Sequence, residues 1–155
     1  MRVLLQRVTE ARVAVDGKTV GAIGTGWLAL AGVGHGDTTT IADQVADKIA
    51  NLRGFEDEQG KTNRSVLDVG GSVLLVSQFT LFADLSRGRR PGFTAAAPPE
   101  EANALVDFVA QALRQRGLDV EQGQFGAHMQ VSLINDGPFT LWLDISPPTA
   151  NSREA

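Results

Sequence analysis

The chain has 155 residues, 43% of them hydrophobic, and this length and composition suit one folded domain with a real core. The formal net charge of −4 argues against a protein that binds nucleic acid over its whole surface, because phosphate binding requires neutralising cations. Since the sequence has no cysteine and only two histidines, disulfides and cysteine nucleophiles are excluded and no metal site is expected. We expect chemistry that uses oxygen, amide or backbone groups, with no cofactor.

No run approaches the roughly 20 apolar residues of a membrane-spanning helix, and the sequence opens with a strand-like pattern rather than a signal-type apolar segment. We therefore expect a cytoplasmic protein that does not bind membranes. No internal repeat or linker divides the chain. The expected domain spans residues 1–146, and residues 147–155, which lack a core pattern, are expected to form a flexible C-terminal tail.

The first third of the sequence is rich in predicted strands. Residues 3–5 and 12–15 alternate well enough to be read as strands. A hairpin turn signal at 16–17 precedes a further strand at 19–23. Residues 27–33 are apolar throughout, which is typical of a strand covered on both faces.

Two helices are predicted from apolar residues that follow the 3.6-residue period. The first has Asp37 as its expected N-cap and ends near Gly54. The second begins at Pro98-Pro99, carries acidic residues in its first turn and finishes at Gly117. For the fold class we expect one α/β domain, with layered β-sheets covered on one side by two helices.

The segment 70–81 is a long apolar run that turns abruptly polar. Residues 73–76 can all be buried, as in a central strand. Ser77, Gln78 and Thr80 follow, and their polar groups cost free energy in a core unless they are hydrogen-bonded. Three polar groups at the end of one strand therefore indicate a site. The alternative is a strand that reaches the surface, with Ser77 and Thr80 capping a bend.

A basic loop follows this segment. The chain has 11 arginines and 3 lysines, and Arg87, Arg89 and Arg90 fall within four residues. Arginine forms forked hydrogen bonds to phosphate, so the cluster is the best candidate for a local anion contact. The alternative is solvated charge on a flexible loop.

The last structured portion contains three predicted strands. They span residues 120–123, 129–133 and 139–145, and the last two alternate. A turn at Asn135–Pro138 is expected to separate these two strands. Met129 is most simply a core residue.

Three of these segments together resemble the D-aminoacyl-tRNA deacylase family. They are Ser77-Gln78-Phe79-Thr80-Leu81, the loop 87–93, and Asn135-Asp136-Gly137-Pro138-Phe139-Thr140. The family's hallmarks are an SQFTL strand end and an NxGPxT turn. Both motifs occur here about 55 residues apart, in a chain of the family's length that opens with a Leu-Gln-Arg-Val segment. The resemblance covers roughly residues 1–146.

The resemblance implies a homodimeric enzyme. Such an enzyme hydrolyses the ester that joins a D-amino acid, or glycine mischarged on tRNA(Ala), to the 3′-terminal adenosine of tRNA, and it rejects L-aminoacyl substrates. Gly137 and Pro138 would form a chirality filter, a cis peptide that reaches into the pocket of the partner subunit. The catalytic residues implied on the pocket floor are Ser77, Gln78, Phe79 and Thr80.

Other site residues are carried over in the same way. Arg7 resembles the arginine that fixes the Gly-Pro turn, and Met129 resembles a residue on the adenosine side. Asn135 and Thr140 belong to the substrate-binding motif. The implied contacts to tRNA phosphates are Arg87, Arg89 and Arg90.

The residue types suit this chemistry. A cis Gly-Pro peptide in a tight turn can aim neighbouring carbonyls the same way, so they can hold an ammonium and leave room on one face only. Backbone N–H groups near Phe79 and Thr80 are candidate donors to the developing oxyanion. We hypothesise that Thr80 positions and polarises without forming an acyl-enzyme.

The sequence departs from the family's pattern at two positions. Arg87 stands where lysine is more usual, which affects the expected phosphate contacts. Gly54 stands where we expect a larger apolar residue. His128 is assigned no role, because an exposed strand histidine is the commoner case.

Two other functions compete with this reading. One is a serine esterase with Ser77 as nucleophile and His35 or His128 as base, although the sequence lacks GxSxG. The other is a non-catalytic module that binds RNA through the arginine loop. A DNA partner is not expected.

Overall fold

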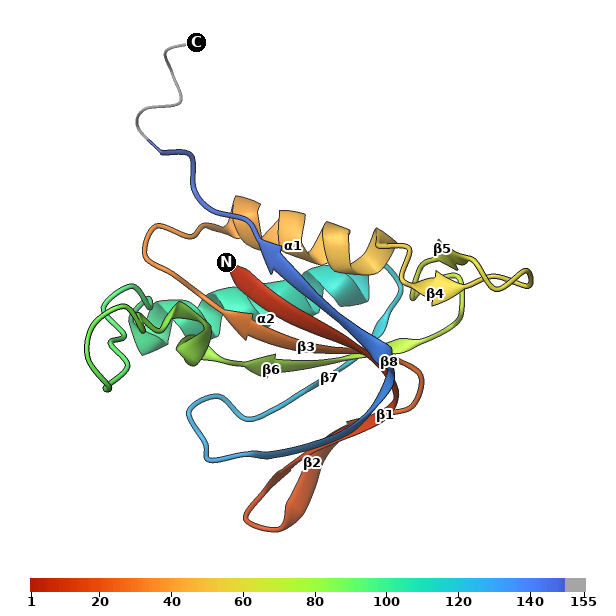
Figure 1. The fold of residues 1–155 in the computed structure, drawn as a ribbon, viewed down its shortest axis with the longest axis horizontal. Helices are drawn as coiled ribbons and strands as arrows, with labels where there is room; N and C mark the ends of the chain where they lie inside the picture. The colour runs from red at the N-terminus through yellow and green to blue at the C-terminus, as the bar shows by residue number, and fades with distance from the viewer. Residues whose placement is uncertain (150–155) are drawn as a thin grey trace.

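The computed structural model describes residues 1–149, which form an α/β domain (Figure 1). The two helices lie together on one side of a six-stranded sheet, so the predicted fold class is confirmed. Neither helix in residues 1–149 is long and apolar enough to cross a membrane. Most of the predicted tail, 147–155, lies outside the described residues. The elements are β1 (Arg2–Val15), β2 (Lys18–Ile23), β3 (Gly26–Gly32), α1 (Thr39–Asn51), β4 (Phe55–Glu56), β5 (Thr62–Arg64), β6 (Ser72–Ser77), the 3-10 helix η1 (Phe79–Phe82), α2 (Pro99–Gln115), β7 (Asp119–Gln122) and β8 (Gln130–Asp144).

The expected layers of strands are parts of one strongly curved sheet with the order β2-β1-β3-β6-β7. Strand β8 pairs with β1 along the edge opposite to β2 and β3. The first half of β1 pairs with β3 and its second half pairs with β2, so β1 leads the sheet from one layer into the other. The outer strands β2 and β7 then approach each other. A Cβ atom at Gly21 of β2 would lie 3.0 Å from the Gln122 carbonyl oxygen of β7, so the sheet is nearly closed.

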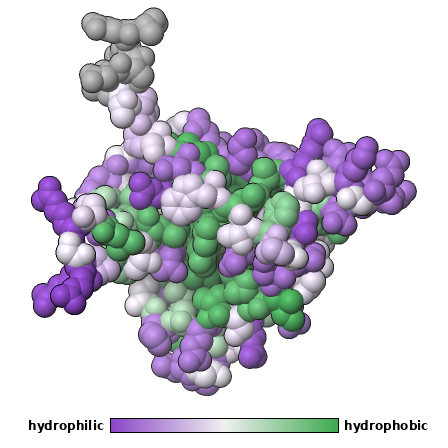
Figure 2. All heavy atoms as spheres, viewed as in Figure 1, coloured by the Kyte–Doolittle hydropathy of each residue, from purple (hydrophilic) through white to green (hydrophobic). Residues whose placement is uncertain are grey.

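Each face of the sheet covers a separate hydrophobic core. Successive strand residues point to opposite faces, so Val73 and Leu75 pack under the helices whereas Leu74 and Val76 pack inside the curved sheet. Residues of β3 alternate in the same way, since Trp27, Ala29 and Ala31 pack under the helices and Leu28 packs inside the curved sheet. The uninterrupted apolar runs in β3 and β6 are therefore explained by burial on both faces, as predicted. Hydrophilic side chains cover the projecting β4–β5 hairpin (Figure 2).

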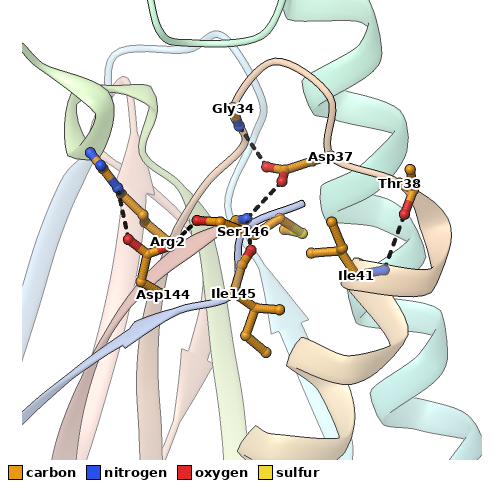
Figure 3. A network of polar contacts seen from close by, with 9 residues as sticks. Arg2, Gly34, Asp37, Thr38, Ile41, Asp144, Ile145 and Ser146 are labelled. Carbon is orange, nitrogen blue, oxygen red and sulfur yellow. Dashed lines mark hydrogen bonds and ion pairs between the residues drawn. The ribbon is translucent and has the colours of Figure 1, made fainter. Parts of the chain in front are cut away.

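The predicted N-cap of the first helix is wrong by one residue. Thr38 caps α1, because its hydroxyl accepts a hydrogen bond from the N–H of Ile41 at 3.3 Å. The carboxylate of Asp37 is instead occupied by the buried ammonium of Met1 at 2.9 Å and by the N–H of Gly34 at 2.7 Å (Figure 3). An ion pair with a distant segment thus competes successfully with the local cap.

The predicted turn at 135–138 is not a reversal. β8 runs through it and stays antiparallel to β1 on both sides, from the pair Ala14 and Gln130 to the pair Arg2 and Asp144. Between these flanks a single β1 residue, Arg7, faces residues 136–139 of β8, which bulge out of the ladder. The peptide bond between Gly137 and Pro138, at the tip of this bulge, is cis.

Candidate active site

A pocket of about 460 Å³ opens at the carboxyl ends of the parallel strands β3 and β6. Crevices at this edge of a parallel sheet are common ligand sites. Ser77 and Gln78 supply polar groups, and most of the other walls are apolar. The lining residues are Ala31, Val33, His35, Ser77, Gln78, Phe79, Phe93, Ala96, Ala97, Pro98, Pro99, Ala102, Val106, Phe125 and Gly126.

The polar wall arises where β6 ends and η1 begins. Ser77 is the last residue of β6, and the N–H of Gln78 extends the ladder by donating to the Ala31 carbonyl at 2.8 Å. The chain then turns into η1, and Ser77 makes no capping hydrogen bond within residues 1–149. The alternative of a strand that reaches the surface is thus correct in geometry, but this turn also forms a wall of the pocket.

The turn presents unpaired donors. The first N–H groups of a helix have no partner within it, and those of Phe79 and Thr80 find none elsewhere in residues 1–149. Both residues are exposed. The Thr80 side chain does not line the pocket, and its hydroxyl accepts a hydrogen bond from the Gln78 amide. This arrangement can stabilise negative charge that develops on an oxygen at the pocket mouth.

A second group of predicted residues surrounds the bulge of β8. Arg7 is only 8% exposed, and its Nε donates to the Asp136 carbonyl at 2.8 Å. The Asn135 side chain donates to the Arg7 carbonyl at 2.9 Å and to the Phe139 carbonyl at 3.0 Å. The Arg7 guanidinium also lies 4.3 Å from the centre of the Phe139 ring. These contacts hold the base of the bulge, while Gly137 and Pro138 at its tip are exposed.

Gly54 departs from our expectation for a physical reason. A Cβ atom there would lie 2.3 Å from the ring of Trp27, so a larger residue would force the indole to move. Trp27 is fully buried and packs against the rings of Phe55 and Phe139, at 5.0 and 6.0 Å between ring centres. The Gly54 carbonyl accepts a hydrogen bond from Nη1 of Arg7 at 2.9 Å. The indole therefore supplies the apolar volume that we expected from residue 54.

The two groups lie at opposite ends of β3. Ala31 of β3 pairs with Ser77, whereas Trp27 pairs with Arg7, opposite the bulge. Four strand residues span about 13 Å. One chain therefore does not bring its own Gly137 and Pro138 to its own residues 77–80.

The remaining predicted residues belong to neither group. Met129 packs against the inner core with its sulfur beside Gly123, and it does not line the pocket. Thr140 accepts a weak hydrogen bond of 3.4 Å from Gln6. Arg87, Arg89 and Arg90 are exposed and make no ion pair within residues 1–149.

The arginine loop is closed by a bridge between Asp84 and Gly92. Asp84 is the single acidic residue between positions 83 and 92. Hydrogen bonds from the hydroxyl and the N–H of Ser86 hold the pKa of Asp84 below its ordinary value. The loop therefore presents net positive charge.

Neither histidine forms a relay with Ser77. His35 lines the pocket, but its Nε2 donates to the Thr94 carbonyl at 2.8 Å. His128 is exposed and does not line the pocket. The geometry gives no support to the serine esterase.

Several pocket residues were missed from the sequence. Phe93, Ala102 and Phe125 come from a loop, a helix and a segment after β7, and the sequence predicts a site role for none of them. Their only sequence signal is proximity to predicted boundaries, which does not show that they converge.

Comparisons with known proteins agree with this architecture. Residues 4–144 match the model of the D-Tyr-tRNA(Tyr) deacylase family. The chain is 63% identical over 144 residues to a D-aminoacyl-tRNA deacylase of Thermomicrobium roseum, an alignment that covers 93% of this chain and 94% of the relative. It is 57% identical to a D-aminoacyl-tRNA deacylase of Chloroflexus aurantiacus, with 99% and 98% of the two chains covered.

Two solved structures are also similar. One is named c-Myc DNA Unwinding Element Binding Protein and has a TM-score of 0.88 at 41% identity, covering 96% of this chain and 100% of that one. The other is a probable eukaryotic D-amino acid tRNA deacylase with a TM-score of 0.78, and at 20% identity it supports the fold alone. The match over most of the chain confirms the resemblance found in the sequence. The chain belongs to the D-Tyr-tRNA(Tyr) deacylase family.

Proposed function

We propose that the protein hydrolyses the ester between a D-amino acid and the 3′-terminal adenosine of tRNA, releasing the free amino acid and tRNA. The observation that carries the proposal is the turn at 77–80, whose unpaired N–H groups lie beside an apolar pocket. The 460 Å³ of the pocket fall within the ordinary range for small-molecule sites, about 300–1,000 Å³. Family membership supports the same reaction.

In the proposed mechanism the terminal adenosine occupies the apolar pocket and its ester lies at the mouth. The N–H groups of Phe79 and Thr80 donate to the ester carbonyl oxygen as it gains negative charge. Gln78 orients the Thr80 hydroxyl, which positions the attacking water. The oxygen of the water bonds to the carbonyl carbon, the bond from that carbon to the ribose 3′ oxygen breaks, and a proton from the water passes to the 3′ oxygen. The products are the free amino acid and tRNA, and no acyl group is transferred to the protein.

Chirality is selected by a second copy of the chain. Because the protein's own bulge is about 13 Å from residues 77–80 along the strand, the tip at Gly137 and Pro138 enters the pocket of the partner in a homodimer. The edge strand β8 supports such an assembly, since Ile134 and Trp142 are 54% and 53% exposed. Apolar side chains gather over β1 and β8 in Figure 2. Glycine mischarged on tRNA(Ala) has no side chain to exclude, so it is also a substrate.

The nucleic-acid partner is the 3′ end of tRNA, in the cytoplasm. Arg87, Arg89 and Arg90 contact its phosphates. Arg87 replaces the more usual lysine, and it adds forked donors to that contact. A similar protein is named for binding a DNA element, but the net charge of −4 on this chain does not favour a duplex partner.

The decisive experiment compares hydrolysis of D-Tyr-tRNA and L-Tyr-tRNA by the purified protein. We expect release of D-tyrosine with little release of L-tyrosine. Equal hydrolysis of the two, or none of the D form, contradicts the proposal. A protein that binds tRNA without releasing either amino acid is the RNA-binding module instead.

Thr80→Ala tests the mechanism at the same site. We expect kcat to fall by about 10²-fold, because the variant keeps the backbone N–H donors but loses the hydroxyl that positions the attacking water. Mass spectrometry of the wild-type protein during turnover should detect no acyl adduct on Thr80 or Ser77. The double variant His35→Ala/His128→Ala should retain hydrolysis, and loss of activity there would restore the serine esterase.

A further inference from the structure

Two phenylalanine rings meet at the mouth of the pocket, and the proposed reaction uses neither. Phe79 is 57% exposed and Phe93 is 38% exposed. Their ring centres are 5.0 Å apart, and the rings meet edge to face at 66°. Both residues line the pocket. An exposed aromatic pair at a pocket entrance leaves ring faces available to a flat ligand.

The segment that connects Phe79 to Phe93 carries a cluster of positive charges. Arg87, Arg89 and Arg90 lie on the loop that leads from η1 to Phe93, and the carboxylate of Asp84 is already engaged by Ser86. Figure 2 shows strongly hydrophilic groups projecting from the end of the molecule where Figure 1 places this loop. Aromatic rings beside a cationic stretch are the two elements of a surface that binds single-stranded nucleic acid.

We propose that the Phe93 ring, supported by Phe79, stacks on the base of the nucleotide immediately before the terminal adenosine. This inference rests on the proposed function. With the adenosine in the pocket, the RNA strand has to leave through the mouth, where the two rings stand. The arginine loop then lies beside the phosphates of the same strand. The ligand class is thus the unpaired 3′ end of an RNA, read by stacking rather than by hydrogen bonds to a base.

The test compares two substrates that differ only in the preceding nucleotides: D-Tyr-tRNA and 3′-(D-tyrosyl)adenosine. Phe93→Leu removes the ring and keeps an apolar side chain at the pocket wall. We expect KM for D-Tyr-tRNA to rise by roughly tenfold more than KM for the short ester, from the usual contribution of one stacked base. Phe93→Trp should restore the KM for D-Tyr-tRNA, which a purely structural role of Phe93 does not predict.

Phe108→Leu is the matched control, because Phe108 is 37% exposed on α2 and does not line the pocket. It should change neither KM. An equal loss on both substrates by Phe93→Leu would overturn the inference, because Phe93 would then act within the adenosine pocket. A shift in oligomeric state of Phe93→Leu, measured by analytical ultracentrifugation, would overturn it too, since a second copy would then cover the ring.

A binding measurement separates this inference from the proposed reaction. The probe is a fluorescent RNA oligonucleotide ending in ACCA, followed by anisotropy with the wild type and with Phe93→Leu. We expect weaker binding by roughly tenfold in the variant, and equal binding would overturn the stacking site. If the wild type binds this probe through Phe93 but hydrolyses neither ester, the reaction is wrong and the stacking site stands.

Discussion

The residues at the two ends of β3 differ in how firmly they are held by hydrogen bonds and packing. At the end near Ser77, the first two residues of η1 are exposed and their N–H groups have no partner within residues 1–149. At the end near Trp27, the base of the bulge is fixed by the buried Arg7, by Asn135 and by packed rings. In the proposed mechanism this difference has a reason: the donors to the substrate are left unpaired so that they can bind it, whereas the tip that selects chirality is fixed at its base.

The largest expected effect is on the bulge. Arg7→Met removes the donors to the carbonyls of Asp136 and Gly54, and we expect the free energy of unfolding to fall by about 2–4 kcal/mol. Discrimination between D-Tyr-tRNA and L-Tyr-tRNA should fall as well. Urea denaturation measures the first effect and paired hydrolysis assays the second. Arg12→Met, an exposed arginine on the same strand, is the control and should cost about 0.5 kcal/mol or less.

A smaller effect is expected beneath the bulge. Gly54→Ala places a methyl group against the Trp27 ring, and overpacking of this kind costs about 1–3 kcal/mol. Trp27→Phe in the same chain should recover part of that loss, because it makes room and removes an indole N–H that has no partner in residues 1–149. Gly24→Ala is the control, since the nearest atom to its added methyl is 4.0 Å away. Additive losses in the double variant would contradict the steric explanation.

At the other end of β3, the Arg2 side chain contacts η1 in two ways. Its Nη1 donates to the Leu81 carbonyl at 3.0 Å, and its guanidinium lies 4.5 Å from the centre of the Phe82 ring. We expect Arg2→Met to lower kcat for D-Tyr-tRNA by roughly tenfold with little change in the melting temperature. Asp144→Asn removes the charge that pairs with Arg2 at the surface and weakens the hydrogen bond from the Ser146 hydroxyl, but keeps the Arg2 contacts to η1, so it should change kcat about twofold or less. Unchanged turnover in Arg2→Met would show that η1 holds its own shape.

The smallest effect is confined to the arginine loop. The pKa of Asp84 is lowered by its hydrogen bonds to Ser86. A lowered pKa in the folded state means that the contribution of this carboxylate to stability is present above its ordinary value of 3.8 and is lost as the pH falls through the folded value. NMR titration should give a pKa for Asp84 below 3.8, and Ser86→Ala should raise it. The pKa of Asp57, lowered by other groups, should not move in that variant.

The helices and the doubly buried strands could be predicted because their signals are local and repeated. The period of Ile41, Val45 and Ile49 marks the buried face of α1, and the apolar runs in β3 and β6 mark burial on both faces. The N-cap was wrong because Asp37 has a partner outside its own segment.

The site was harder to predict than the fold. The local sequence at 135–138 reads as a hairpin, but the length of β1 lets it pair with both flanks, so a bulge forms instead. The motif at 77–80 was found, yet Phe93 and Phe125 reach the same pocket from distant segments. The fit between Trp27 and Gly54 likewise depends on a contact that no local pattern encodes.

Because of the bulge, the number of residues in β8 can change without changing how β8 pairs with β1. Asn135 and Thr140 are both paired with β1, whereas residues 136–139 are outside the ladder. A residue inserted or deleted there leaves Leu133 and Leu141 on their present faces, although a one-residue slip inside a ladder reverses every side chain. The reach of the tip is therefore a variable that evolution or an engineer can change separately from the fold.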